Sequence, residues 1–226
     1  MARSVIVTGG FGFLGQAVAQ AFAKDGDKVA RIDFAPKAKS ALPGTLDIGG
    51  VDLTDAASTR AALDKVKATH GGIDVLVNVA GGFTWETLEG GSIDAWARMQ
   101  SMNLLTAATI TQLALPALKG SAAGRIVNIG AGAANKAGAG MGAYAASKSG
   151  VHRLTEALAE ELAGTAVTVN AILPSTIDTP VNRADMPDAD FSTWVQPAAI
   201  ADVIGFLASD NARAISGALI PVTRGG

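Results

Sequence analysis

The sequence predicts an α/β fold, a doubly wound parallel sheet with helices on both faces. Short runs rich in Val and Ile alternate with longer stretches that carry apolar residues at helical spacing, which is the pattern of βαβ units. The short runs are almost continuously apolar, as are strands buried on both faces. With 226 residues, 49 % of them hydrophobic, the chain can bury a sizeable core but is too short for two large domains. We therefore expect a single domain over residues 1–226.

The predicted elements alternate along the chain. We expect strands at residues 4–7, 28–32, 75–79, 125–129, 167–173 and 218–222. We expect helices at residues 16–24, 55–70, 93–118, 147–163 and 197–208. Gly26, Gly71 and Gly164 follow three of the helices as stop signals, and Pro197 suits the first turn of the last one. The long irregular stretch 174–196 has the length of a lid or binding loop.

The composition excludes several classes of function. Lys and Arg number 18 against 20 Asp and Glu, so the chain lacks the basic field that nucleic acid requires. It has no cysteine, and its histidines, His70 and His152, are scattered, so we expect neither a disulfide nor a metal site. No apolar run is long enough to span a bilayer, and the first residues enter a strand pattern without a signal-peptide core. We therefore expect a cytoplasmic protein that binds neither nucleic acid nor membrane.

A dinucleotide-binding motif follows the first strand. Gly10, Gly12 and Gly15 form a GxGxxG pattern that opens a helix. Glycines there let the backbone turn tightly and approach a pyrophosphate, whose charge lies against the first amides of the helix. The alternative is that the glycines only make a tight turn. The residues that we expect to bind cofactor at this turn are Gly9, Gly10, Gly12, Phe13, Leu14 and Gly15.

Asp33 stands at the end of the second predicted strand, where an acidic residue binds the ribose of NAD. Its carboxylate would accept hydrogen bonds from the ribose hydroxyls and repel a 2′-phosphate. We therefore predict that NAD(H) is preferred over NADP(H). Arg31 and Lys37 lie close enough in sequence to weaken that preference, but we interpret both as solvated surface charges.

Tyr144 and Lys148 are candidate catalytic residues. They lie four apart at the start of a predicted helix and so share one face. A tyrosine with a pKa of about 10 is a poor acid at neutral pH, and an adjacent ammonium lowers that pKa. The pair could donate a proton to a substrate while a nicotinamide gives hydride. Tyr-x-x-x-Lys is common by chance, but Tyr144 is the only tyrosine in the chain.

Together these motifs resemble the short-chain dehydrogenase/reductase family along nearly the whole chain. The matching segments, in the family's order, are Thr8-Gly9-Gly10-x-Gly12-x-x-Gly15, Asp52-Leu53, Asn78-Val79-Ala80-Gly81, Asn103, Tyr144-x-x-x-Lys148 and Pro174-x-x-Ile177-x-Thr179. The resemblance implies a three-layer Rossmann-like fold with about seven strands in the order 3-2-1-4-5-6-7. It also implies an NAD(P)-dependent oxidoreductase that forms a homodimer or homotetramer through helices near residues 104–118 and 151–162.

The resemblance implies a role for each matched position. Asp52 and Leu53 would flank the adenine, and Lys148 would bind the nicotinamide ribose as well as assist Tyr144. Asn103 would hold a water in a proton relay, or would only cap or kink its helix. The cofactor-side backbone would be formed by Asn78, Ala80 and Gly81, where Asn78 has the alternative of only bracing strands. The carboxamide of the nicotinamide would be held by Ile177 and Thr179, and Pro174 would also bind the cofactor.

Two positions depart from the family's pattern. Phe13 stands where ordinary members carry the middle glycine of the turn. Ala131 stands thirteen residues before Tyr144, where ordinary members carry a serine that hydrogen-bonds the substrate carbonyl, and no hydroxyl side chain occurs between Asn128 and Tyr144. Loss of such a donor costs about 100- to 1000-fold in rate. We therefore expect a poor reducer of simple ketones.

One branch of the family, the quinonoid dihydropteridine reductases, also lacks this serine. The chain is most similar to that branch, above all over residues 173–194, which cover most of the predicted substrate lid 174–196, although Asn103 departs from the branch. A quinonoid dihydropterin is electron-poor and accepts hydride with less help than a ketone. We expect the substrate to lie against Ala131, Phe83, Met141, Met186 and Trp194, with Trp85 nearby. Each of these apolar side chains has the alternative of packing only in a core or lid.

The sequence leaves three functions open. The first is an NADH-dependent reductase of quinonoid dihydropterin or a similar electron-poor ring. The second is a general carbonyl or alcohol oxidoreductase in which a water or a backbone amide replaces the serine missing at Ala131. The third is a dinucleotide-binding regulatory protein without turnover, against which the intact pair of Tyr144 and Lys148 argues.

Overall fold

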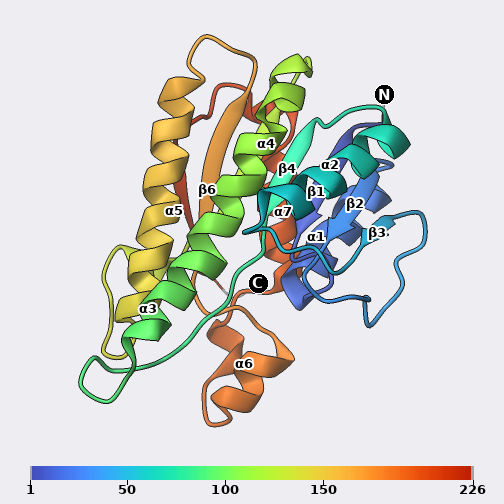
Figure 1. The fold of residues 1–226 in the computed structure, drawn as a ribbon. Coiled ribbons are helices and arrows are strands. Elements are labelled where there is room, and N and C mark those ends of the chain that lie inside the picture. Colours follow the sequence, from blue (N-terminus) through green and yellow to red (C-terminus); the bar gives the residue numbers. More distant parts are fainter. Residues whose placement is uncertain (1, 225–226) are drawn as a thin grey trace.

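A computed structural model, which describes residues 2–224, builds the chain around one parallel sheet. The sheet has seven strands in the order β3-β2-β1-β4-β5-β6-β7, and every neighbouring pair is parallel. Helices cover both faces (Figure 1). The predicted fold class and strand order are confirmed.

The strands are short and mostly buried. They are β1 Ser4–Thr8, β2 Lys28–Ile32, β3 Leu46–Ile48, β4 Val75–Asn78, β5 Arg125–Ile129, β6 Thr168–Pro174 and β7 Leu219–Val222. The six strands placed from sequence are present within one residue or two at each end. β3 has no counterpart among them, because a three-residue edge strand with an Asp at its centre offers no apolar run to recognise.

The helices differ more from expectation. They are α1 Phe13–Lys24, α2 Ala56–His70, α3 Ile93–Met99, α4 Thr106–Gly120, α5 Gly142–Glu161, α6 Pro180–Asp185 and α7 Pro197–Leu207. The single helix predicted over 93–118 is wrong, since a π-helix at Gln100–Leu105 separates α3 from α4. The stretch 174–196 is not wholly irregular either, because it contains α6 and a 3-10 turn at Phe191–Thr193.

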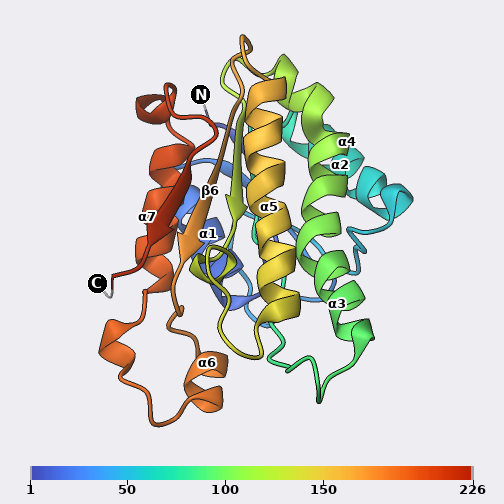
Figure 2. The same cartoon turned by 90° about the vertical axis from the view of Figure 1, so that its left-hand side faces the viewer.

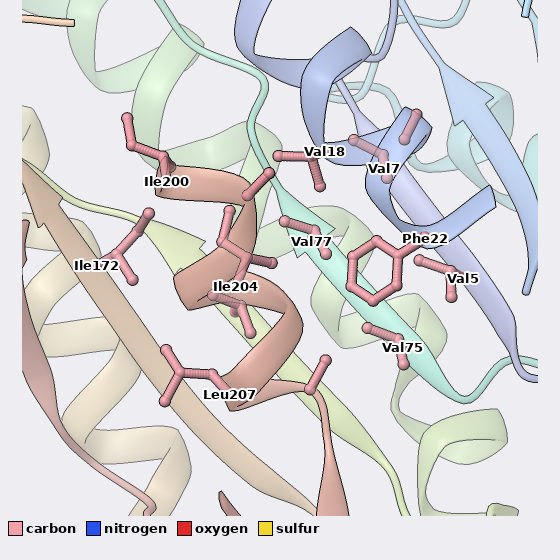
Figure 3. Packing of buried hydrophobic residues seen from close by; sticks show 14 of the residues in the cluster. Val5, Val7, Val18, Phe22, Val75, Val77, Ile172, Ile200, Ile204 and Leu207 are labelled. Atoms are coloured by element: carbon pink, nitrogen blue, oxygen red, sulfur yellow. The ribbon is translucent and has the colours of Figure 1, made fainter. Parts of the chain in front are cut away.

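Two hydrophobic clusters bind the three layers together. On one face of the sheet α1 and α7 pack against the strands, and on the other face lie α2, α4 and α5 (Figures 1 and 2). Phe22 of α1 and Ile204 of α7 meet Val75 and Val77 of the central strand β4 (Figure 3). Strands buried on both sides explain the nearly continuous apolar runs of the sequence.

Local signals end and begin the helices as expected. Gly71 adopts a left-handed conformation with φ 93° at the C-terminus of α2, and Pro197 lies in the first turn of α7. The Asp55 carboxylate caps α2 by accepting from the amides of Ala57 and Ser58.

Within residues 2–224, no helix is both long and apolar enough to cross a membrane.

All strands are parallel, so their carboxyl ends share one edge of the sheet. Thr8, Asn78, Ile129 and Pro174 end four of these strands. Helix α6 extends from this edge, at the bottom of Figure 1. In open parallel sheets, ligands bind outside this edge.

Candidate functional site

The glycine-rich turn between β1 and α1 is tightly packed on itself. Gly9 has φ 61°, a conformation that L side chains rarely adopt. A Cβ at Gly15 would collide with the carbonyl oxygen of Gly9, so α1 can begin this close to the turn only with glycine there. Phe13, the first residue of α1, is 56 % exposed, whereas Leu14 is buried in the core.

The N-terminus of α1 fits an anion. Gly12 is its N-cap, no side chain caps it, and its first turn holds no acidic residue. The positive end of the dipole of this 12-residue helix therefore has no side-chain cap among the described residues. The turn suits the pyrophosphate of a dinucleotide.

Thr8 connects this turn to the next strand of the sheet. Its Oγ1 accepts hydrogen bonds from the amides of Val79 and Ala80, each at 3.0 Å, and donates to the Val77 carbonyl at 3.4 Å. The hydroxyl thus fixes the backbone of residues 79–80 beside the glycine turn. Sequence reasoning used Thr8 only as a motif position and gave it no role.

Asp33 lies beside the glycine turn. Its Oδ2 accepts from the amide of Phe11 and its Oδ1 from that of Ala35, both at 2.9 Å. The carboxylate is half-buried and retains lone pairs with which to meet a ribose. Its contact with a ribose stays a prediction.

The interpretation of Arg31 as a solvated surface charge is wrong. Its side chain is fully buried and forms two hydrogen bonds with the Asp47 carboxylate, at 2.8 and 2.6 Å. Asp47 lies on β3, the strand that sequence reasoning did not find, so this partner was not visible. Lys37 is exposed, as expected.

Asp52 and Leu53 follow β3. The Asp52 carboxylate accepts from the amide and hydroxyl of Thr54, and these hydrogen bonds lower its pKa below the ordinary value. Leu53 is 5 % exposed and packs in the cluster below α2 and α4. The structure keeps the two residues together at the same end of the sheet as Asp33.

Lys148 reaches from α5 to the carboxyl end of β5. Its Nζ donates to the carbonyl of Ile129 at 2.7 Å. The side chain is buried, and burial lowers its pKa to about 8. A Cβ at Gly81 would lie at an ordinary contact distance of 3.5 Å from this Nζ but only 2.5 Å from Asn103 Oδ1, so it is Asn103 that requires a glycine at this position.

Tyr144 precedes Lys148 by one turn of α5. Burial raises the pKa of its hydroxyl to about 12. This corrects the expectation that the adjacent ammonium lowers it: in the protein alone, the cost of burying a phenolate outweighs the attraction of Lys148, whose own charged form burial also disfavours. At neutral pH the phenol is protonated.

Asn103 lies at the centre of the π-helix. Its Oδ1 accepts from the Gly82 amide at 2.9 Å, and its Nδ2 donates to the Gly82 carbonyl at 3.1 Å and to Ser147 Oγ at 3.0 Å. Ser147 in turn donates to the carbonyl of Tyr144 at 2.7 Å. Asn103 thus connects the backbone after β4 to the helix that carries Tyr144, and it lies where its helix is distorted.

Asn78 braces the layers. Its Nδ2 donates to Asn128 Oδ1 on β5 at 2.8 Å and to Thr111 Oγ1 on α4 at 3.0 Å. Asn128 donates in turn to Thr155 Oγ1 on α5 at 2.9 Å. This ladder supports the bracing interpretation of Asn78.

Ala131 follows β5, and its backbone amide is directed toward a histidine. The amide donates to Nε2 of His152 at 3.4 Å, with both residues buried. The pKa of His152 lies below its ordinary value, and burial is the main cause. The ring is therefore neutral at pH 7, and its Nε2 can accept a hydrogen bond. The sequence gave His152 no role of its own.

Several predicted substrate residues gather around Tyr144. The Phe83 ring meets the Tyr144 ring edge to face, with centroids 4.9 Å apart and planes at 83°. Trp85 lies directly against Gly140, and the Glu86 amide donates to the Gly140 carbonyl at 2.8 Å. Met141 precedes the first turn of α5 and is half-buried. Phe83 and Trp85 are 53 % and 61 % exposed, so both keep free apolar surface.

The segment 174–196 is closed at its stem and packed on itself. Ile177 and Val195 form a parallel bridge, and Asp178 binds Arg183 through two hydrogen bonds and Gln196 through a third. Thr179 caps α6 by accepting from the Asn182 amide.

Met186 and Trp194 take different positions within this segment. Trp194 is 6 % exposed and its ring lies against Phe191, with centroids 4.7 Å apart. Met186 is 42 % exposed at the end of α6. The structure does not bring Trp194 against Tyr144, whereas Met186 keeps a free surface; contact of either with a substrate stays a prediction.

Groups of three or more His, Cys, Asp or Glu side chains that could hold a metal ion do not occur within residues 2–224.

Comparison with known proteins gives consistent matches over nearly the whole chain. The family model described as short chain dehydrogenase matches residues 3–190. The chain is 31 % identical to the 3-oxoacyl-(acyl-carrier-protein) reductase FabG of Thermotoga maritima, over 97 % of this chain and 96 % of the relative. It is 34 % identical to the 3-oxoacyl-(acyl-carrier-protein) reductase MabA of Mycobacterium tuberculosis, over 100 % and 93 %. The ligand-free structure of Thermoplasma acidophilum aldohexose dehydrogenase matches with a TM-score of 0.89 and 30 % identity, over 99 % of this chain and 93 % of that one.

Proposed function

The chain belongs to the short-chain dehydrogenase family of NAD(P)H-dependent oxidoreductases, and we propose that it transfers hydride to an electron-poor ring such as quinonoid dihydropterin. One observation carries the proposal. The proton-donating pair of Tyr144 and Lys148 is intact, whereas the neighbouring position that would polarise a ketone is Ala131. A substrate that needs a proton but little electrophilic help fits this combination.

The geometry at Ala131 also argues against a backbone substitute for the missing hydroxyl. Its amide donates to Nε2 of the buried His152 and so already has a partner within the protein. The residues that follow, 132–143, carry no hydroxyl side chain. A simple ketone would therefore lack one of the donors that stabilise a developing oxyanion.

The residues divide the work of the reaction. A bound nicotinamide supplies the hydride. Tyr144 is protonated at neutral pH and donates its proton to the reduced ring, and Lys148, on the same face of α5, stabilises the phenolate that results. The Phe83 ring packs edge to face with the Tyr144 ring, and Phe83 and Trp85 each keep exposed aromatic surface that the acceptor could contact.

We further propose that NADH is preferred over NADPH. Asp33 supports this, because its carboxylate lies beside the glycine turn, where it would accept from the ribose hydroxyls and repel a 2′-phosphate. Arg31, the nearest cation in sequence, is buried and paired with Asp47 rather than free to meet a 2′-phosphate.

The segment 174–196 is the proposed lid of the same site, and its closed stem supports a unit that can move as a whole.

A substrate panel tests the proposal. Purified protein is given NADH or NADPH with quinonoid dihydropterin, simple ketones and a 3-oxoacyl thioester, and oxidation of the cofactor is followed. We expect turnover of the dihydropterin well above the uncatalysed rate and little turnover of the ketones. Tyr144→Phe should lower dihydropterin turnover at least about 100-fold while NADH binding is retained. Background rates with dihydropterin, or an unaffected Tyr144→Phe variant, would contradict the proposal.

A second candidate, carbonyl reduction, is favoured by the relatives, two of which are named 3-oxoacyl-(acyl-carrier-protein) reductases. Ala131→Ser separates the two candidates, since it restores a hydroxyl at the empty position. If the chain is a carbonyl reductase weakened at this position, ketone or oxoacyl turnover should rise by about 100-fold or more. If our proposal is right, the wild-type protein already turns over dihydropterin faster than ketones. Ala131→Ser then changes the turnover of dihydropterin by less than about 10-fold. NADH binding without hydride transfer to any acceptor would instead favour a regulatory protein.

A further inference from the structure

Four residues form a charged corner between the glycine turn and the edge of the sheet. We call Phe11, Arg31, Asp33 and Asp47 the β2 corner. Arg31 on β2 and Asp47 on β3 are direct partners in the parallel register, and Asp33 follows two residues after Arg31 on the same side of the strand. Phe11 is in the glycine turn and donates its amide to Asp33.

Arg31 is a fully buried cation in direct contact with this turn. A Cβ at Gly10 would lie 2.7 Å from the Arg31 Cβ, so Gly10 rests on the arginine stem. The Phe11 ring covers the guanidinium, whose Cζ lies 5.3 Å from the ring centroid. Two of its nitrogens donate to Asp47, while Nη1 is buried without a partner among residues 2–224.

The charges of the corner do not cancel. One cation and two carboxylates leave a net charge of −1 beside the position where Asp33 would meet the ribose. Because the carboxylate of Asp47 neutralises the positive charge of Arg31, the negative charge of Asp33 is not neutralised within the corner. Without Asp47 the corner would be neutral, and without Arg31 its charge would be −2.

We propose that the Arg31–Asp47 pair sets the choice between NADH and NADPH by keeping this corner negative. Asp47 is then a specificity-determining residue that acts through Arg31 and does not itself touch the cofactor. The inference rests on the proposed dinucleotide site but not on the identity of the acceptor.

Equilibrium binding of NADH and NADPH to the unliganded protein, by titration calorimetry, tests the proposal without turnover. The measured quantity is the ratio of the two dissociation constants. Asp47→Asn should shift the ratio about 10-fold toward NADPH, because it removes a negative charge near the 2′-phosphate. Arg31→Met should shift it about 10-fold in the opposite direction. The double variant, which restores the net charge of −1, should return within about 2-fold of the wild-type ratio.

Shifts of opposite sign in the ratio of dissociation constants for the two single variants would exclude a merely structural role of the pair. If the pair only holds the edge strand, both single variants should weaken the two dinucleotides equally and leave the ratio unchanged. Asp47→Asn leaves a buried arginine unpaired and can fail to fold. Arg31→Met leaves Asp47 at the surface, where its side chain is already 38 % exposed, so this variant and the double variant still decide the question.

Asp64→Asn is the matched control. It removes one negative charge from α2, at a side chain that is 59 % exposed, and should leave the ratio unchanged. An unchanged ratio in the folded corner variants, or a shift of the same sign in both, overturns the proposal. Failure to bind either dinucleotide would instead overturn the proposed function, so the two failures are distinguishable.

Discussion

At the scale of single residues, burial sets the pKa values of Tyr144 and Lys148, the proposed catalytic pair. Lys148 and Tyr144 carry the expected side chains at the expected spacing, but their pKa values move to about 8 and about 12 because both are taken out of water. The spacing of a motif shows that two groups share a helix face, and it does not show how much solvent remains around them. The sign of the tyrosine shift was therefore beyond the sequence.

The Lys148 shift predicts a pH dependence of stability. Between about pH 8 and 10 the folded protein releases the Lys148 proton while the unfolded chain, with a pKa near 10.5, keeps it. The unfolded state then binds more protons, so the free energy of unfolding should rise with pH across this window, by on the order of 2 kcal/mol. Above pH 10 the raised pKa of Tyr144 acts in the opposite direction, because the unfolded chain loses its phenol proton first.

Urea unfolding of wild type and Lys148→Met at pH 7, 8, 9 and 10 measures this effect. The difference between the two proteins should grow in favour of wild type from pH 8 to 10, since the methionine cannot titrate. Groups common to both proteins cancel. Parallel curves across the window would contradict the assigned burial of Lys148.

At the scale of elements, two segments took forms that the sequence pattern concealed. The residues of 93–118 keep helical apolar spacing throughout, yet the π-helix interrupts them where Asn103 bonds to the peptide of Gly82 and to Ser147. The partners lie 21 and 44 residues away, so no local signal marks the distortion. Such π-helical turns are frequent at functional sites.

Helix α6 is a different case, because its signal was present. Thr179 followed by Pro180 is a capping residue and a first-turn proline, the usual start of a helix. The helix has only six residues including Pro180, which are too few to show helical periodicity in the sequence.

At the scale of the whole molecule, the outer faces of α4 and α5 support the proposed homodimer or homotetramer. A groove of about 530 Å³ runs between the two helices, lined by Gln112, Leu115, Pro116, Lys119, Leu158, Glu161 and Leu162. Leu105, just before α4, is 50 % exposed. A second copy would cover such apolar surface.

Sedimentation equilibrium tests the assembly. We expect a mass of two or four chains for wild type and a shift toward the single chain of 22.7 kDa for Leu105→Lys, whose exposed position should tolerate the charge without loss of fold. Circular dichroism checks that fold. A wild-type protein that sediments only as one chain would contradict the proposed assembly.

The sequence by itself determined the α/β class, six of the seven strands and the positions of the glycine turn, Asp33, Tyr144 and Lys148, because apolar periodicity and turn chemistry are local properties. The tertiary structure alone decided that Arg31 is buried against Asp47, that the Ala131 amide faces His152, and that Asn103 bonds across to Gly82. Each of these depends on a partner 16 or more residues away along the chain. Such partners meet only when strands and helices pack, so the burial and the hydrogen bonding of these residues are properties of the fold.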